Sequence, residues 1–242
     1  MNLGKTLRLK NFFRHGPNTI LVPLDHGITL GPIKGIESIA GTIDSLSKLT
    51  IDGIILHKGI ITSCSDTIIK SDIPLIMHLS ANTNLSKECT KILVGNVREA
   101  LSLGASAVSV HINFGTPNEV IMLRDVAYIS EECFKYGMPL LTMAYHSNNN
   151  AETISHIARA CSELGADLIK VPPTKKGEDF SKVVSGCPVP LIISGGEFDS
   201  NINNIISNAV SCGARGVAIG RNLFQSDDIK NAFEDIQKIV RK

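Results

Sequence analysis

Short apolar runs, many of them β-branched, recur along the chain, and each is followed by a turn and then by a stretch with helical spacing. A run that is apolar at nearly every position is typical of a parallel strand covered on both faces. Such runs predict strands at residues 19–25, 53–57, 75–79, 107–113, 140–146, 168–172, 191–194 and 216–220. Between them the spacing predicts helices at 35–49, 89–103, 117–136, 151–164, 199–212 and 227–240, with weaker signals at 60–72 and 177–186.

Strands and helices alternate without a break in composition, which predicts an α/β fold of the (β/α)8 TIM-barrel type. We expect one domain over residues 1–242, with residues 1–17 as a short N-terminal extension whose helix covers the bottom of the barrel. A doubly wound open sheet is the alternative, but the first turn lacks the G-x-G-x-x-G pattern. Three helix-to-strand junctions repeat a glycine that is expected in a left-handed conformation: Leu103-Gly104-Ala105, Leu164-Gly165-Ala166 and Cys212-Gly213-Ala214.

Composition narrows the class of protein. The chain has 242 residues, 43% of them hydrophobic, and a net charge of +1, which gives no overall field for nucleic acid or a membrane surface. No apolar run approaches the roughly 18 residues that cross a bilayer, and the basic start does not resemble a secretory signal. The cysteines form no C-x-x-C pair and predict small core residues of a reduced, cytoplasmic protein: Cys64, Cys89, Cys133, Cys161, Cys187 and Cys212.

Lys170 stands inside the sixth predicted strand, where a charged side chain is costly unless it has a partner or does chemistry. If the face shared by Leu168 and Lys170 is the lumen, burial and nearby cations would lower the pKa of Lys170 and favour Schiff-base formation with a carbonyl. A structural ion pair with Asp25 or Glu197 is the alternative. Other lysines compete less well: Lys58 at a strand edge, and Lys175 and Lys176 in a loop.

Further polar residues fall at the C-terminal ends of the strands, where TIM barrels carry their active sites. Tyr145 ends the fifth strand and could transfer a proton, or could be a core tyrosine. Asp25 ends the first strand and could hold a substrate hydroxyl or the lysine, or act as a base. His26 and Lys58 follow the first and second strands and are further candidates for substrate binding.

Glycine turns follow the seventh and eighth strands, where barrels often bind phosphate through backbone N–H groups and a nearby cation. The residues concerned are Ser194, Gly195, Gly196, Gly220 and Arg221. The alternative is that these glycines only make tight turns.

Five histidines at strand ends raise a rival hypothesis, a metal site in the barrel mouth. They are His26, His57, His78, His111 and His146. The chain lacks an H-x-H pair, and neighbouring strand residues point to opposite faces, so these histidines need not converge, and we expect no metal to be bound.

Seven segments together resemble the archaeal-type class I fructose-bisphosphate aldolase family, over nearly the whole chain. They are LVPLDHGITLGP, ILHKGI, IMHLSANTNL, VSVHINFG, GMPLLTMAYH, GADLIKVPPT and GVAIGRNLFQ. Within that family HLSANTNL is similar to the 2-amino-3,7-dideoxy-D-threo-hept-6-ulosonate synthases. Met143 stands where the fructose-bisphosphate aldolases tend to carry tryptophan, which also favours that branch.

The resemblance implies a class I aldolase or transaldolase without a cofactor. Lys170 would be the Schiff-base lysine, Tyr145 the proton-transfer residue and Asp25 the carboxylate. The implied reaction joins part of a phosphorylated deoxy-ketosugar to L-aspartate semialdehyde, on a route toward aromatic amino acids or an aminobenzoate. A fructose-bisphosphate aldolase, or an aldolase joining dihydroxyacetone phosphate to aspartate semialdehyde, is the alternative. The family also implies a homo-oligomer.

Two loops depart from that resemblance. Relatives usually follow the tyrosine with Pro-Arg-Gly, whereas this chain has His146-Ser147-Asn148 and a shorter loop. The turn after Gly196 is also reduced. The missing arginine therefore affects the expected recognition of substrate more than the expected Schiff-base chemistry.

Overall fold

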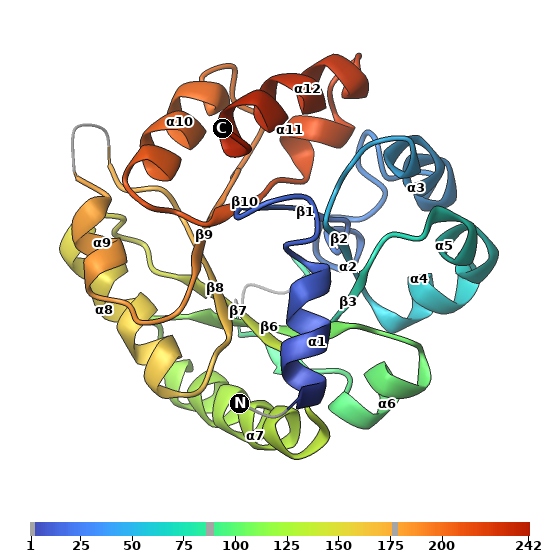
Figure 1. The fold of residues 1–242 in the computed structure, drawn as a ribbon. Helices are drawn as coiled ribbons and strands as arrows, with labels where there is room; N and C mark the ends of the chain where they lie inside the picture. Colours follow the sequence, from blue (N-terminus) through green and yellow to red (C-terminus); the bar gives the residue numbers. More distant parts are fainter. Residues whose placement is uncertain (1–2, 86–89, 176–178) are drawn as a thin grey trace.

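The computed structural model describes residues 3–85, 90–175 and 179–242. Within them, eight parallel strands close into a barrel in the ring order β1-β2-β3-β6-β7-β8-β9-β10 (Figure 1). These strands are β1 (Thr19–Pro23), β2 (Gly53–Leu56), β3 (Leu75–His78), β6 (Ala107–Asn113), β7 (Leu140–Tyr145), β8 (Leu168–Val171), β9 (Leu191–Ser194) and β10 (Gly216–Ala218). The predicted TIM barrel is confirmed, and the alternative of an open sheet is wrong because β10 pairs with β1.

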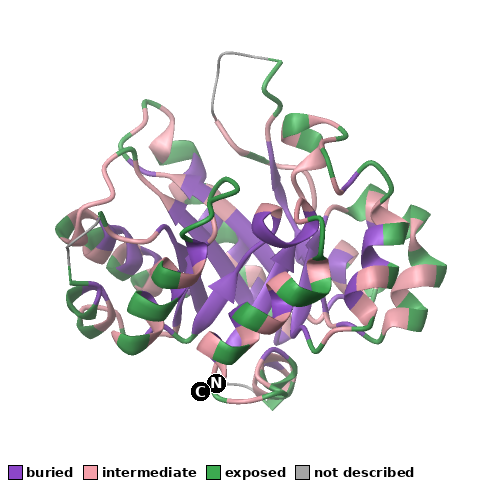
Figure 2. Ribbon diagram, turned by 90° about the horizontal axis from the view of Figure 1, so that it is seen from above, coloured by how far each residue is buried: buried purple, intermediate pink, exposed green. Residues whose placement is uncertain are grey.

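Helices surround the barrel, and Figure 2 shows the buried strands inside this half-exposed shell. They are α1 (Leu3–Asn11), α2 (Gly27–Leu30), α3 (Ile39–Ser47), α4 (Lys58–Ser63), α5 (Ser65–Ser71), α6 (Val97–Ser102), α7 (Glu119–Tyr136), α8 (Ala151–Glu163), α9 (Ser181–Ser185), α10 (Ile202–Ser211), α11 (Arg221–Phe224) and α12 (Ile229–Val240). The two weak helix signals correspond to α4 with α5 and to α9. No described helix is both long and apolar enough to span a membrane.

The helix expected over residues 89–103 is only partly correct. Its first residue, Cys89, lies outside the described residues, and β5 (Ile92–Leu93) instead pairs antiparallel with β4 (Ser80–Ala81). Helix α6 begins only after Asn96, whose side chain accepts a hydrogen bond from the Glu99 N–H. Because asparagine favours such a cap and a glycine precedes it, the helix starts there and not eight residues earlier.

Side chains alternate between two cores along the strands. Leu21, Ile55, Leu141 and Leu168 fill the lumen with other apolar residues, while their strand neighbours pack outward against the helices. This period-two alternation is what a strand geometry requires. The lower lumen is therefore a packed apolar layer, and side chains two positions further along each strand rise toward the C-terminal mouth.

Helix α1 lies across the opposite, N-terminal end of the barrel, as expected (Figure 1). The ring of Phe12, which directly follows α1, is 1% exposed and packs into the lumen core. Lys5 forms a 2.9 Å ion pair with Asp167, just before β8, and Arg8 donates to the Gly137 carbonyl. The bottom of the barrel is therefore closed by an apolar plug and held by polar contacts.

The small residues behave largely as predicted. Gly104, Gly165 and Gly213 have φ of +75°, +92° and +102°, which closes the preceding helices in the left-handed region. The five cysteines in the described part are free; Cys133 and Cys161 are buried, and Cys64, Cys187 and Cys212 are half-buried. Cys89 lies outside the described residues.

Replacing Phe12 by alanine should lower the free energy of unfolding by about 3–5 kcal/mol, because it leaves a cavity under the lumen core. Ile69→Ala is the matched control, since Ile69 is 77% exposed and its loss should change stability by no more than about 0.5 kcal/mol. Chemical denaturation of both variants measures the difference. Equal stabilities would show that Phe12 does not plug the barrel.

Candidate active site

A cavity of about 330 Å³ opens at the C-terminal ends of the strands. Its lining includes Lys170, Tyr145, Asp25 and Arg221, which come from β8, β7, the end of β1 and the end of β10. Four residues widely separated in sequence thus meet at the end of the barrel where such folds carry their chemistry.

Lys170 points into this cavity from the lumen face of β8. It is 7% exposed, and Leu168, two residues earlier, lies in the lumen core. The carboxylate of Asp25 contacts His26 and His78, and that of Glu197 contacts Arg221. Among the described residues neither carboxylate forms an ion pair with Lys170, so a purely structural salt bridge does not explain its burial.

Asp25 is the central negative charge of the mouth. Its oxygens lie 3.8 Å from His26 Nδ1 and 3.7 Å from His78 Nε2. Burial alone would raise the pKa of Asp25, but at the acid pH where this carboxyl would take up a proton the protonated histidines around it, together with Lys170, outweigh burial and hold the pKa well below its usual value. Asp25 therefore remains a carboxylate through the physiological range.

The surrounding histidines are held in the neutral form. Burial lowers the pKa of His78 to about 3 despite the opposing pull of Asp25, and it lowers the pKa of His111 to about 3 with a contribution from Lys91. Burial also lowers the pKa of His26 and of His57. At neutral pH these imidazoles are hydrogen-bonding groups, and the formal charges of the cavity come from its lysines, arginine and carboxylates.

Two of these histidines are fixed by neighbours. His78 Nδ1 is 2.8 Å from Ser109 Oγ, deep in the lumen. His111 bonds Asn113 at 2.8 Å and stacks on the Tyr145 ring, with centroids 4.8 Å apart and planes 19° apart. This stacking sets the plane of the phenol, whose hydroxyl is carried toward the cavity at the end of β7.

The two glycine turns lie side by side and are joined by Asn222. Its side-chain amide donates to the Gly195 and Glu197 carbonyls, and its oxygen accepts from the Asp199 N–H. A Cβ at Gly220 would come within 2.6 Å of the Pro23 carbonyl oxygen, so only glycine fits there.

Arg221 reaches the cavity from the second turn. Its guanidinium is 3.5 Å from Glu197, whose side chain is largely exposed, so that pair is weakly held. Buried polar atoms of three cavity residues have no hydrogen-bond partner within the described structure, namely His26 Nδ1, His57 Nε2 and Arg221 Nε. These atoms are available to a polar ligand, because buried groups of this kind are otherwise almost always paired.

Not every predicted residue reaches the cavity. Lys58 begins α4 and pairs with Glu99 at 3.1 Å beside a neighbouring apolar hollow. Ser194 is buried in β9 below its turn. His146 turns away toward Gly115. Lys175 is exposed, and Lys176 lies outside the described residues.

Lys91 was missed by the sequence analysis but lines the cavity from the segment just before β5. Convergence of the histidines was left open by the sequence, and the structure brings four of them to this cavity: His26, His57, His78 and His111. Within the described residues, however, no group of three or more His, Cys, Asp or Glu side chains is arranged to hold a metal ion. These four histidines surround Asp25 and are not arranged like the ligands of a metal centre.

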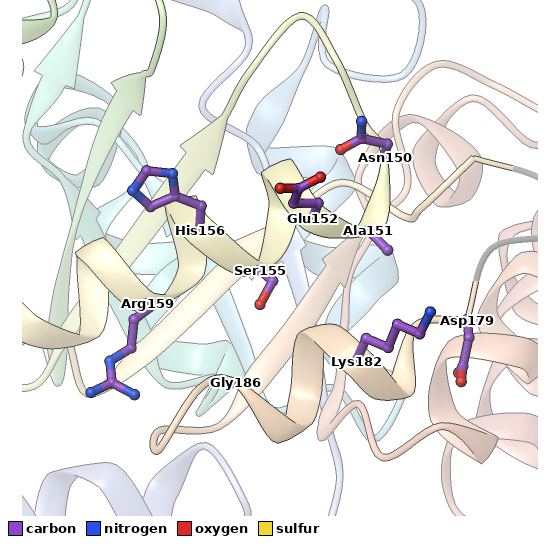
Figure 3. Close-up of a pocket in the computed structure, with 9 residues that line it drawn as sticks. All are labelled: Asn150, Ala151, Glu152, Ser155, His156, Arg159, Asp179, Lys182 and Gly186. Atoms are coloured by element: carbon purple, nitrogen blue, oxygen red, sulfur yellow. The ribbon is translucent and has the colours of Figure 1, made fainter.

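A larger hollow, of about 890 Å³, lies on the outside of the barrel between α8 and α9 (Figure 3). It carries His156 and Arg159 from α8 and Lys182 from α9. Figure 3 shows the imidazole and guanidinium pointing away from the lysine, so the charged groups do not converge. Its larger volume therefore does not make it a better candidate for the active site than the cavity at the barrel mouth.

The chain is similar to known aldolases over most of its length. Residues 19–226 match the model of the DeoC/LacD family of aldolases. The 2-amino-3,7-dideoxy-D-threo-hept-6-ulosonate synthase 1 of Archaeoglobus fulgidus is 39% identical over 98% of this chain and 91% of the relative. The 2-amino-4,5-dihydroxy-6-oxo-7-(phosphonooxy)heptanoate synthase of Streptomyces griseus is 35% identical over 93% of this chain and 86% of the relative.

A solved structure of a Schiff-base-forming fructose-1,6-bisphosphate aldolase, studied through its reaction intermediates, superposes with a TM-score of 0.88. It is 27% identical to this chain, and the match covers 98% of this chain and 99% of the other. The similarity therefore extends over the barrel and both of its ends.

The buried neutral His78 should make the fold sensitive to acid. Its pKa is about 3 in the folded state against 6.5 for the free side chain, so the unfolded chain binds the proton first as pH falls. The stability that the neutral form of His78 contributes is fully present above pH 6.5 and is lost progressively toward pH 3. Lowering the pH from 7.5 to 5 should therefore reduce the free energy of unfolding by about 2 kcal/mol.

The test compares His78→Gln with His156→Gln, an exposed position, by denaturation at both pH values. His78→Gln should lose about 2 kcal/mol less than the wild type on acidification, whereas His156→Gln should behave like the wild type. An unchanged acid loss in His78→Gln would mean that His78 is not the buried neutral group described.

Proposed function

The chain belongs to the DeoC/LacD family of aldolases, and on that premise we propose that Lys170 forms a Schiff base with a phosphorylated ketose and passes its enamine to L-aspartate semialdehyde. The observation that carries this proposal is a lysine buried in the barrel mouth, in one cavity with Tyr145 and Asp25, and not ion-paired with the carboxylate of Asp25 or Glu197. The enzyme is an aldolase; the residue roles and the substrates are our assignment.

The names of the two relatives support aspartate semialdehyde as the aldehyde. Both describe a seven-carbon 2-amino acid with a carbonyl at carbon 6, and they differ at carbon 7, which is deoxy in one and phosphonooxy in the other. An aldol bond joins the carbon next to a ketone to an aldehyde carbon, here carbon 5 to carbon 4. Carbons 1 to 4 then correspond to a four-carbon 2-amino acid with a terminal aldehyde.

In the first candidate reaction the donor is a phosphorylated deoxy-ketosugar, as for an ulosonate synthase. The Lys170 amine attacks the ketone, water leaves, and the protonated imine draws electrons from the adjacent carbon–carbon bond. That bond breaks as a proton leaves the neighbouring hydroxyl, releasing a three-carbon phosphorylated aldehyde and leaving a lysine enamine. The enamine carbon adds to aspartate semialdehyde, and water hydrolyses the new imine to free the lysine.

Tyr145 and Asp25 would share the proton transfers. The phenol of Tyr145, stacked on His111 at the mouth, is suited to take the hydroxyl proton on cleavage and return it on addition. Asp25, with its lowered pKa and its two histidine contacts, remains anionic and stabilises the positive charge of the imine. His78, held by Ser109, keeps that carboxylate oriented.

The second candidate donor is dihydroxyacetone phosphate, whose phosphate stays on the enamine fragment. The joined glycine turns favour it, because they lie next to β8 and present Arg221 to the cavity. Ser194, Gly195, Gly196, Gly220 and Arg221 are our proposed phosphate-binding residues, with His26 beside them. Lys58 is a weaker candidate for substrate binding, since it pairs with Glu99.

We also propose a cytoplasmic homo-oligomer without a bound cofactor. The free cysteines support a reducing compartment. Exposed apolar side chains on α7, among them Val120, Tyr128 and Phe134, support a face that a second copy covers.

The proposed function is tested by borohydride reduction in the presence of each ketose, followed by intact-protein and peptide mass spectrometry. A reduced adduct should form on Lys170 and be absent from Lys170→Met, while Lys48→Met, an exposed control, should keep it. A three-carbon adduct without phosphate identifies the first donor, and one with phosphate identifies the second. No adduct with either ketose would exclude the Schiff-base mechanism.

Tyr145→Phe should still form the borohydride adduct but turn over about 10²–10⁴-fold more slowly, since it loses only the proton carrier. Tyr128→Phe, changed at an exposed position on α7, is the matched control and should keep the wild-type rate. Single-turnover kinetics with the preferred donor separate imine formation from cleavage. A wild-type cleavage rate in Tyr145→Phe would remove the phenol from the mechanism.

A further inference from the structure

Lys91 is a cavity cation that neither the sequence motifs nor the proposed mechanism uses. It lies directly before β5, in the segment that returns after β3. The pairing of Ser80 with Leu93 and of Ala81 with Ile92 brings this segment back beside the end of β3. The Val94 N–H donates to the Leu79 carbonyl and fixes the return.

Thr29 of α2 forms hydrogen bonds with residues on both sides of this return, beside the mouth of the cavity. Its hydroxyl donates to the Asn82 carbonyl, its own carbonyl accepts from the Asn84 N–H, and the Lys91 ammonium approaches its hydroxyl at 3.5 Å. Lys91 is half-buried and lines the cavity. It is close enough to oppose protonation of His26, His57, His78 and His111 alike. The lysine is therefore held above the site.

The cations of the cavity are distributed around its rim. Lys170 stands on β8 and Arg221 at the end of β10, on either side of β9. Lys91 belongs to the β3 side, and β3 is directly opposite β9 in the ring of eight strands. A ligand bound to Lys170 can therefore have one end at the glycine turns and the other at Lys91.

The acceptor assigned above has a carboxylate two carbons from its aldehyde. A carboxylate entering a cavity that already holds Asp25 requires a cation of its own, because like charges in a half-buried site repel. If dihydroxyacetone phosphate is the donor, its phosphate stays on the enamine and occupies Arg221. The carboxylate of the acceptor is then bound on the Lys91 side of the cavity. If the phosphate leaves with the first aldehyde, Arg221 is the alternative to Lys91 as the group that binds the acceptor carboxylate.

We propose that Lys91 binds the carboxylate of the acceptor aldehyde and so selects a carboxylate-bearing acceptor over a neutral one. This assignment rests on the proposed function, since it takes the enamine on Lys170 as the partner of that aldehyde. It holds for either ketose donor, because both relatives are named for 2-amino acid products.

The test measures KM for two acceptors at saturating donor, L-aspartate semialdehyde and 3-aminopropanal, which lacks the carboxylate. Lys91→Met should raise KM for aspartate semialdehyde roughly 10- to 100-fold, the loss expected for a hydrogen bond to a charged group. KM for 3-aminopropanal should stay within about twofold. Lys91→Arg should restore most of the difference, and the exposed control Lys34→Met should match the wild type.

Three results would overturn the assignment. Equal losses for both acceptors in Lys91→Met would indicate a general effect on the mouth. No loss for either would remove Lys91 from acceptor binding. A carboxylate-dependent loss in Arg221→Met but not in Lys91→Met would move the carboxylate to the glycine turns.

The Lys170 adduct, trapped by borohydride in the same variants, separates this proposal from the proposed function. An adduct in Lys91→Met together with an unchanged acceptor KM refutes only the role of Lys91. An adduct in the wild type without turnover of aspartate semialdehyde refutes the acceptor, and Lys91 with it, while the Schiff-base mechanism stands. No adduct in the wild type refutes both.

Discussion

The alternation of side chains along eight parallel strands is the constraint on which the rest of the structure depends. It sends every second residue into a lumen that Phe12 closes from below and that Leu21, Ile55, Leu141 and Leu168 fill. A polar side chain can enter the lumen only above this layer, where water and ligand reach it. Lys170, two positions after Leu168, has no other direction to point, so the same geometry that packs the core also places the amine in the mouth.

Burying that amine would be costly if its surroundings were also positive. The low pKa values of His78 and His111 keep both imidazoles neutral, and Asp25 stays ionised among them. The site thus holds one central carboxylate among several cations with neutral hydrogen-bonding groups between them. Such a balance favours anionic substrates, and it makes formation of the imine cation beside Asp25 less costly than it would be in an apolar pocket.

The strands and the barrel could be predicted from sequence because near-continuous apolar runs are unambiguous in a fold that covers both faces of its sheet. The direction of Lys170 followed from the same period of two, and Tyr145 was expected near the site because it ends a strand. Lys91 and the return through β5 could not be predicted, because two residues of antiparallel pairing leave no periodic signal and Ile92 is itself exposed. The convergence of the histidines did not follow from the sequence, for another reason. His26 reaches the cavity from the turn just before α2, beyond the strand end, where strand alternation no longer applies.

The loop after Tyr145 shows how a departure from the resembled pattern changes the site without disturbing the barrel. His146 accepts a hydrogen bond from the Asn148 N–H and packs against Gly115, where any Cβ would collide with its ring. Asn150 then caps α8 by accepting from the Thr153 N–H. The chain therefore leaves β7 directly into its helix and brings no arginine to the mouth. Because that cation is missing on the β7 side, our proposal assigns the anionic ends of the substrates to Arg221, at the start of α11, and to Lys91, just before β5.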